Sequence, residues 1–213
     1  MLSVVDVAER RGVSARRVRQ LIHAGRIPAY RVGGRFVVAD ADAGIAGAVC
    51  RPMSQRMAWA FVHALSGARV EGLAAAEMTR IRRYLVRLAA CENPAALLAA
   101  WLPKRAARIV FNATSDVLPA LRSDPRVILS GVSDERSGLS SLSEVEAYIA
   151  SDAVPEVVRD YLLLRAGQPN VFLHVSDASL SLPVPVGVVL ADLAEHGGPR
   201  ERGQVVALLR GLL

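Results

Sequence analysis

Two short helical patterns joined by a glycine-containing turn constrain the fold of this chain more than any other feature. The first predicts a helix over residues 4–11, whose apolar positions follow the i, i+3, i+4 spacing of a buried face: Val4, Val7 and Ala8. Ser3 and Asp6 form a capping-box pattern at its start. Gly12 is expected to end it, because glycine enters the left-handed region easily. We expect Val13 to fill the space before the second helix.

The second pattern predicts a helix over residues 15–24, with Ser14 as N-cap and Gly25 as its end. Its apolar side is formed by Val18, Leu21 and Ile22. Its other side carries Arg16, Arg19, Gln20 and His23. Arginine can bond a guanine edge at two points, and glutamine can do the same for adenine. Arg17 lies between the two sides, where its long stem can reach a phosphate. This succession of helix, turn and capped helix predicts a helix-turn-helix.

A hairpin is predicted directly after these helices. Two β-rich runs within residues 27–38 flank Gly33 and Gly34, which are typical of a two-residue hairpin turn. Arg31 and Arg35 bracket this wing and are expected to face a DNA backbone or minor groove. Asp40 is expected to cap a third helix over residues 41–48. The basic side of the second helix could be only a solvated face, but the wing favours binding to double-stranded DNA. The candidate DNA-binding residues are Ser14, Arg16, Arg17, Arg19, Gln20, His23, Tyr30, Arg31 and Arg35.

Residues 1–48 resemble the excisionase-like branch of the MerR superfamily. The resemblance rests on the runs 3–8 (SVVDVA), 12–14 (GVS), 17–18 (RV), 21–22 (LI), 25–29 (GRIPA) and 31–35 (RVGGR). It implies that the second helix enters the major groove and that the wing contacts the backbone or the minor groove. Gly34 departs from the family, where Arg, Lys or Asn is frequent. The long dimerising coiled coil of MerR regulators is also missing, so formation of a homodimer is left open.

Charge divides the chain into three segments. Residues 1–48 carry eight Arg against four acids, and residues 49–111 carry ten basic residues against three acids. Residues 112–213 carry eight Arg against thirteen acids. The basic N-terminal segments suggest binding to nucleic acid, and the acidic C-terminal segment suggests binding to a protein.

Other features exclude several classes of protein. No apolar run is long enough to span a membrane, and the start has no signal-peptide pattern, so we expect a cytoplasmic protein without membrane contact. Cys50 and Cys91 are the only cysteines, and neither lies in a C-x-x-C. We therefore expect reduced thiols, no metal site and no cofactor.

Residues 49–111 form a basic helical segment, with helices predicted over residues 57–65, 73–91 and 95–101. The second of these carries an arginine stripe: Arg80, Arg82, Arg83 and Arg87. A basic cluster follows at Lys104, Arg105 and Arg108. The arginines of the stripe could contact phosphates. They could equally form a solvated face, or ion pairs with the acidic C-terminal segment.

Residues 112–213 are predicted to form a small α+β domain. Strands are expected over residues 126–129 and 171–175. Helices are expected over residues 116–121, 144–150, 155–164, 186–195 and 200–213. The whole chain is therefore predicted to be α+β and mostly helical. The segment has no P-loop, no G-x-S-x-G and no G-x-G-x-x-G. We interpret His174 as a structural histidine, and we expect no catalytic residues and no enzyme activity.

The C-terminal segment also resembles the AbiEi antitoxins, which accompany nucleotidyltransferase-type toxins in actinobacteria. The resemblance rests on the runs 124–127 (DPRV), 130–133 (SGVS), 170–175 (NVFLHV), 191–193 (ADL) and 199–201 (PRE). It implies an autorepressing transcriptional regulator whose residues 112–213 bind a toxin. There are two alternatives. The first is an excisionase, which is a recombination directionality factor that bends DNA. The second is a nucleic-acid-modifying enzyme that residues 1–48 direct to DNA. We expect a fragment that begins near Asn112 to fold by itself and to bind the partner without DNA.

Overall fold

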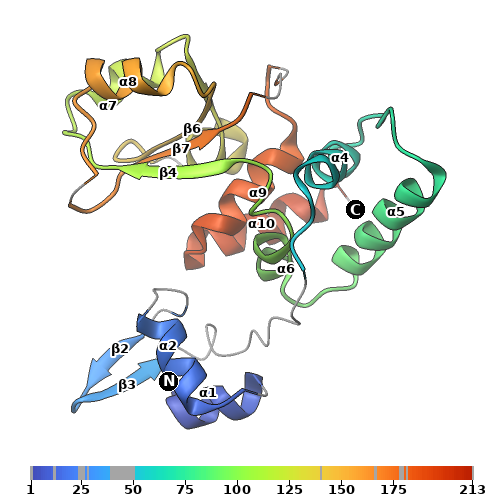
Figure 1. Ribbon diagram of the computed structural model, residues 1–213, viewed down its shortest axis with the longest axis vertical. Helices are drawn as coiled ribbons and strands as arrows, with labels where there is room; N and C mark the ends of the chain where they lie inside the picture. Colours follow the sequence, from blue (N-terminus) through green and yellow to red (C-terminus); the bar gives the residue numbers. More distant parts are fainter. Residues whose placement is uncertain are drawn as a thin grey trace. The chain divides into compact units, whose positions relative to one another are not determined.

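The computed structural model describes residues 2–11, 13–23, 27, 29–38, 51–139, 141–165, 167–177, 180 and 182–212. The chain divides into two compact units, Met1–Cys50 and Arg51–Leu213, called unit 1 and unit 2 below. Helices and two small sheets give an α+β, mostly helical fold, as predicted (Figure 1). Unit 2 includes both the basic helical segment and the acidic segment of the sequence.

Unit 1 contains two helices, α1 (Val4–Arg11) and α2 (Ala15–His23). Its three-stranded sheet has the order β1-β3-β2, built from β1 (Leu2–Ser3), β2 (Tyr30–Val32) and β3 (Arg35–Val38). The core consists of Val4, Val7, Ala8, Val18, Ile27 and Val38. The two predicted helices and the hairpin are confirmed, whereas the pairing of β1 with β3 was not predicted.

Local hydrogen bonds explain why unit 1 folds as its sequence predicts. The Ser3 amide donates to Asp6 Oδ2 at 2.9 Å, and the Asp6 amide donates to Ser3 Oγ at 3.3 Å, which completes the capping box. Both glycines of the wing have positive φ, 56° at Gly33 and 79° at Gly34, as a tight hairpin turn requires. Val13 was predicted to fill the space between the two helices, but the structure leaves it 39% exposed. The predicted helix over residues 41–48 lies outside the described residues.

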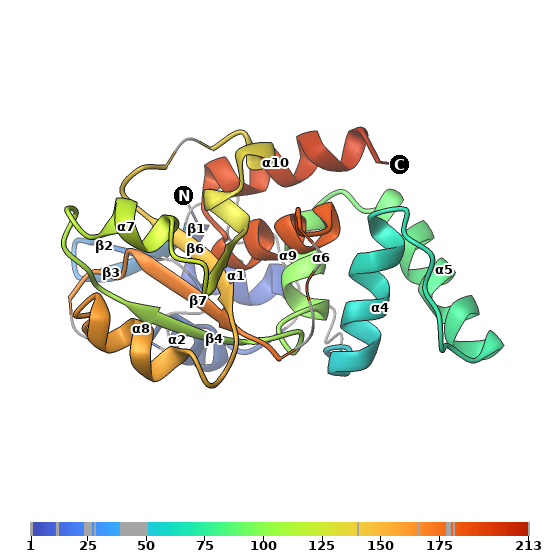
Figure 2. The same cartoon turned by 90° about the horizontal axis from the view of Figure 1, so that it is seen from above.

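The helices of unit 2 gather around α9 (Val186–His196). This helix contacts α4 (Gln55–Leu65), α6 (Pro94–Trp101) and α10 (Pro199–Arg210), as Figure 2 also shows. The longer α5 (Ala75–Ala89) packs against α4 and α6. Helices were predicted in all five places, with ends that differ by up to three residues. The middle and C-terminal segments of the sequence therefore share one helical core.

The sheet of unit 2 has the strand order β4-β7-β6-β5. Its strands are β4 (Ala107–Phe111), β5 (Val127–Leu129), β6 (Val145–Ile149) and β7 (Val171–Val175). The β6–β7 pair is parallel and the other two pairs are antiparallel. One face of the sheet packs an apolar core with α7 (Leu118–Arg122) and α8 (Val154–Asp160) (Figure 1). Residues on the opposite face of the sheet approach α9 and the short 3-10 helix η1 (Gly131–Ser133).

Two predictions for this sheet were wrong. Residues 144–150 were predicted as a helix but form β6, in which every residue is buried. The apolar positions Val145, Ala147 and Ile149 alternate with Glu146 and Tyr148, which is the period of a strand. Strand β4 was missed, although three of its five residues, Ile109, Val110 and Phe111, are typical strand formers. Both strands gain their stability from pairing with β7, which lies far away in the sequence.

Candidate nucleic-acid interface

The side of α2 opposite the core presents two side chains that can read bases. Val18 is fully buried, and residues two positions before and after it on a helix point the other way. These residues are Arg16 and Gln20, which are both exposed and lie four positions apart on one face. The arrangement puts a guanidinium and a carboxamide side by side on the helix surface.

A half-buried aromatic ring joins α2 to the wing. The ring of Phe36 in β3 meets the ring of His23 edge-on, with 5.3 Å between their centroids. On the wing, the guanidinium carbon of Arg31 lies 5.2 Å from the centre of the Phe36 ring. The His23 ring also donates from Nδ1 to the carbonyl of Arg19 at 2.7 Å. His23 and Arg31 therefore hold the interface together as well as facing outward.

Phe36 was not among the predicted site residues. The signal in the sequence is the aromatic residue that directly follows Arg35, on the strand that leads back from the turn. Because β3 pairs with both other strands, this ring fixes the wing relative to α2.

A second cationic position lies where α2 meets the wing. Arg19 of α2 and Arg35 of β3 line one hollow of about 530 Å³, together with Ser3, Val5 and neighbouring residues. Two arginines that converge on a concave surface are suited to an anion such as a phosphate. The geometry thus brings together Arg19 and Arg35, which the sequence had placed on separate elements.

The remaining candidates lie apart from this hollow. Ser14 caps α2, because its Oγ accepts a hydrogen bond from the Arg17 amide at 3.2 Å. The Arg17 side chain is exposed at the start of α2, and Tyr30 is exposed at the start of β2. Ser14 therefore has a structural role at the N-terminus of α2, where it binds a free backbone amide. Arg17 and Tyr30 extend the exposed surface.

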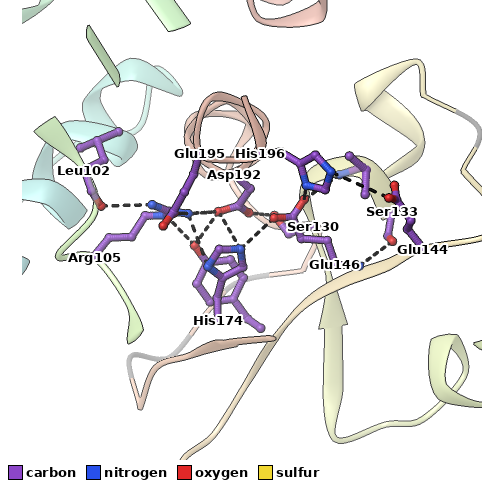
Figure 3. A network of polar contacts seen from close by, with 12 residues as sticks. Leu102, Arg105, Ser130, Ser133, Glu144, Glu146, His174, Asp192, Glu195 and His196 are labelled. Atoms are coloured by element: carbon purple, nitrogen blue, oxygen red, sulfur yellow. Dashed lines mark hydrogen bonds and ion pairs between the residues drawn. The ribbon is translucent and has the colours of Figure 1, made fainter. Parts of the chain in front are cut away.

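Unit 2 contains a polar network between its sheet and α9, shown in Figure 3. At its centre, Arg105 is 1% exposed and donates from Nη2 to Asp192 at 2.5 Å and to Glu195 at 2.7 Å. Its Nε donates to the hydroxyl of Tyr148 at 2.9 Å. Arg105 is therefore not part of an exposed basic cluster, because it pairs with acids of the C-terminal segment.

The ionisation of this network follows from its geometry. Burial opposes the cation of Arg105, but the carboxylates of Asp192 and Glu195 outweigh burial and raise its pKa above the usual value. Burial, reinforced by Asp192, raises the pKa of the Tyr148 phenol well above its usual value. Tyr148 thus stays a neutral donor, and its hydroxyl reaches Asp192 at 3.1 Å.

His174 is a structural histidine, as predicted. Its Nδ1 lies 3.4 Å from Nη2 of Arg105, which can only donate, so Nδ1 accepts. Its Nε2 therefore carries the hydrogen and donates to Glu146 at 2.9 Å. The other oxygen of Glu146 accepts from the Val132 amide at 3.0 Å. These groups satisfy one another and are all fully buried.

The loop of residues 130–133 also belongs to this network. Ser130 donates to Asp192, and Gly131 adopts a φ of 52°. A Cβ at Gly131 would lie 1.9 Å from Glu146 Oε2, so the loop requires a glycine where the carboxylate approaches. Its serine and glycine therefore hold buried acids in place.

A comparison with family models gives one match. Residues 1–42 match a model described as a helix-turn-helix domain. Searches of curated proteins and of solved structures gave no match. The N-terminal unit therefore contains a helix-turn-helix domain, as the sequence predicts. The match ends before residues 112–213, where the resemblance to AbiEi antitoxins stays a prediction.

Two further observations concern the described part of the chain only. It contains no group of three His, Cys, Asp or Glu side chains placed to hold a metal ion. It also contains no helix long and apolar enough to cross a membrane. Cys91 is a half-buried free thiol, and Cys50 lies outside the described residues.

Proposed function

We propose that this chain is a sequence-specific regulator of transcription that binds double-stranded DNA through unit 1 and represses its own promoter. The observation that carries the proposal is the exposed pair Arg16 and Gln20 on α2, next to a wing with Arg31 and Arg35. In helix-turn-helix proteins the second helix lies in the major groove, where these side chain types read guanine and adenine. The wing cations supply contacts to the backbone.

Single substitutions separate base reading from backbone binding. Arg16→Ala and Gln20→Ala should each reduce the preference for the promoter duplex over a scrambled duplex by roughly 1–3 kcal/mol. Arg35→Ala should weaken binding to both duplexes alike. Arg159→Ala removes an exposed arginine of unit 2 and serves as the control. If Arg35→Ala alone removed the preference, the roles of helix and wing would be reversed.

Salt dependence tests the backbone contacts. If unit 1 neutralises about four to six phosphates, log K should fall against log salt with a slope of roughly −4 to −5. The measurement is a titration of the full chain with the promoter duplex between 50 and 200 mM salt. A flat response at high affinity would contradict a DNA-binding function.

At a finer level, we propose that unit 2 binds a protein partner, a nucleotidyltransferase-type toxin, so that the chain acts as an antitoxin. An exposed apolar surface beside the edge strand β4 supports this proposal. Leu162 is 77% exposed and Leu164 is 61% exposed, and Leu164 pairs with Asn112 directly after β4. Val110 on β4 is also exposed. Leu162 has a φ of 50°, an uncommon conformation for a bulky residue.

Co-expression tests the partner. The product of the adjacent reading frame should co-purify with the chain, and the double variant Leu162→Asp/Leu164→Asp should lose it while still binding the promoter duplex. Leu142→Asp, which changes another exposed leucine, serves as the control. A complex that survives the double variant would contradict this surface, and absence of a complex would contradict the antitoxin function.

The alternatives make different predictions. An excisionase would bend its duplex, and its gene would lie beside that of an integrase. We propose a regulator instead, because residues 51–213 greatly exceed a winged helix in length. We also propose that the chain is not an enzyme, since the buried acids of unit 2 are occupied by Arg105, Tyr148 and His174. Formation of a homodimer is a further proposal, which sedimentation of the full chain with a palindromic duplex can test.

A further inference from the structure

A basic hollow lies at the start of unit 2, and its lining includes none of the side chains of the polar network. Its volume is about 300 Å³, and its cations come from three separate segments: Arg51 before α4, Arg80 on α5, and Lys104 after α6. The hydroxyl-bearing side chains Ser54 and Tyr84 line the same hollow. None of the described lining residues is acidic.

Packing and hydrogen bonds hold these three segments in place. The Met53 amide donates to the carbonyl of Trp101 at 2.8 Å, which ties the first segment to the end of α6. Gln55 Nε2 donates to the carbonyl of Arg105 at 3.4 Å, which ties α4 to the segment of Lys104. The ring of Tyr84 lies 4.8 Å from that of Trp101, which ties α5 to α6. The hollow is therefore a feature of the packed core and not of one mobile side chain.

The cations of the hollow differ from the paired arginines elsewhere in unit 2. Within the described residues, Arg51 and Lys104 make no ion pair. Arg80 lies near Glu77, but that carboxylate is bonded by Arg56 at 2.6 and 3.0 Å. Arg83 lies three positions after Arg80 on the same exposed face of α5, so the positive surface continues beyond the hollow.

We propose that this hollow binds a phosphate of the DNA backbone, so that unit 2 makes a second contact with the duplex held by unit 1. Converging arginines and hydroxyl groups are the donors that phosphate recognition uses. The extension of the basic surface to Arg83 suits a strand with successive phosphates better than a single free phosphate. This inference rests on the proposed function of unit 1.

The covalent connection favours such a contact. Twelve residues separate Val38 from Arg51, so the chain between them spans at most roughly 45 Å. Once unit 1 is bound, the hollow stays at a high effective concentration near the flanking backbone. A contact that is weak by itself therefore adds to the affinity of the whole chain.

The test compares two triple variants of the full chain. Arg51→Ala/Arg80→Ala/Lys104→Ala removes the cations of the hollow, and Arg69→Ala/Arg82→Ala/Arg200→Ala removes three exposed arginines elsewhere. The probes are the promoter duplex with and without flanking base pairs. The slope of log K against log salt should become shallower by about 0.9 for each phosphate lost, only for the hollow variant and only on the flanked duplex. If one phosphate contact is lost, the ratio of the wild-type to the hollow-variant association constant falls about 3.5-fold between 50 and 200 mM salt.

The outcomes are distinguishable. If wild-type binding depends on Arg16 and Gln20 but the hollow variant has the wild-type slope, this inference fails and the proposed function stands. If both triple variants lose the same slope, net charge explains the loss and the inference also fails. Binding of inorganic phosphate to the hollow, without any effect on the duplex, would overturn DNA as the ligand. If the wild-type chain binds no duplex, both proposals fail.

Discussion

The exposed arginines of unit 1 and the buried Arg105 of unit 2 serve opposite purposes. In unit 1, Arg16 and Arg35 are exposed on a helix and a wing that enclose a small, wholly apolar core. In unit 2, Arg105 is buried and bonded to Asp192, Glu195 and Tyr148. The comparison teaches when the local sequence shows that an arginine is exposed. It does so only where the surrounding structure is formed by residues close together in the sequence. Where the fold is assembled from distant segments, the role of an arginine depends on its distant partners.

The largest expected effect comes from separating the segments that Arg105 joins. A fragment of residues 112–213 lacks β4, α6 and Arg105, and would leave Asp192 buried without its cation. We therefore expect residues 51–213 to unfold cooperatively in urea and residues 112–213 to show no cooperative transition. This expectation differs from the one drawn from the sequence, that a fragment beginning near Asn112 folds by itself. A cooperative transition of residues 112–213 by circular dichroism would show that the network is dispensable.

Removing Arg105 alone should have the next largest effect. Arg105→Ala should lower the free energy of unfolding of residues 51–213 by roughly 3–5 kcal/mol, because it leaves the buried carboxylate of Asp192 without its cation. Arg105→Met/Asp192→Leu should cost less than the single change, since the buried carboxylate of Asp192 is removed together with its cation. Urea denaturation measures both. A cost below about 1 kcal/mol for Arg105→Ala would mean that water reaches Asp192.

A pair of glycines gives a smaller and more local test. Gly131→Ala forces a methyl group against Glu146 and keeps a positive φ, so it should cost roughly 2–4 kcal/mol. Gly67→Ala is the control, because its φ is 74° but no atom lies within 4 Å of the added Cβ. It should cost roughly 1–2 kcal/mol from the backbone alone. Equal costs at the two sites would contradict the close approach of Glu146.

The smallest expected effect is in unit 1. Phe36→Leu keeps an apolar side chain in β3 but removes the ring contacts with His23 and Arg31. We expect it to lower the stability of unit 1 by roughly 0.5–1.5 kcal/mol, with the stability of unit 2 unchanged. Thermal unfolding of residues 1–50 and of residues 51–213, measured separately, checks this. A loss in residues 1–50 above about 3 kcal/mol would mean that Phe36 belongs to the core.

These contrasts also explain how far the sequence could predict the molecule. Unit 1 was predictable because its caps and turn glycines act within a few residues, as the Ser3–Asp6 bonds show. Strand β6 was mistaken for a helix because its partners on both sides lie elsewhere in the chain. Arg105 could not be recognised as buried, because its partner Asp192 lies 87 positions away. The exposed side of α2 follows the pattern in the sequence, but the place of Phe36 depends on how the wing packs.

The strand order β4-β7-β6-β5 has a consequence for synthesis of the chain on the ribosome. The last strand to be made, β7, is inserted between two strands made earlier, and Asp192 emerges later still. Unit 1 has its complete core once Val38 has emerged, more than 150 residues sooner. At about 5–20 residues per second, this leaves roughly 8–30 s in which a nascent chain carries a finished helix-turn-helix and an unfinished sheet. Until β7 arrives, β4 has no neighbouring strand in the sheet, and β6 is paired only on the side of β5.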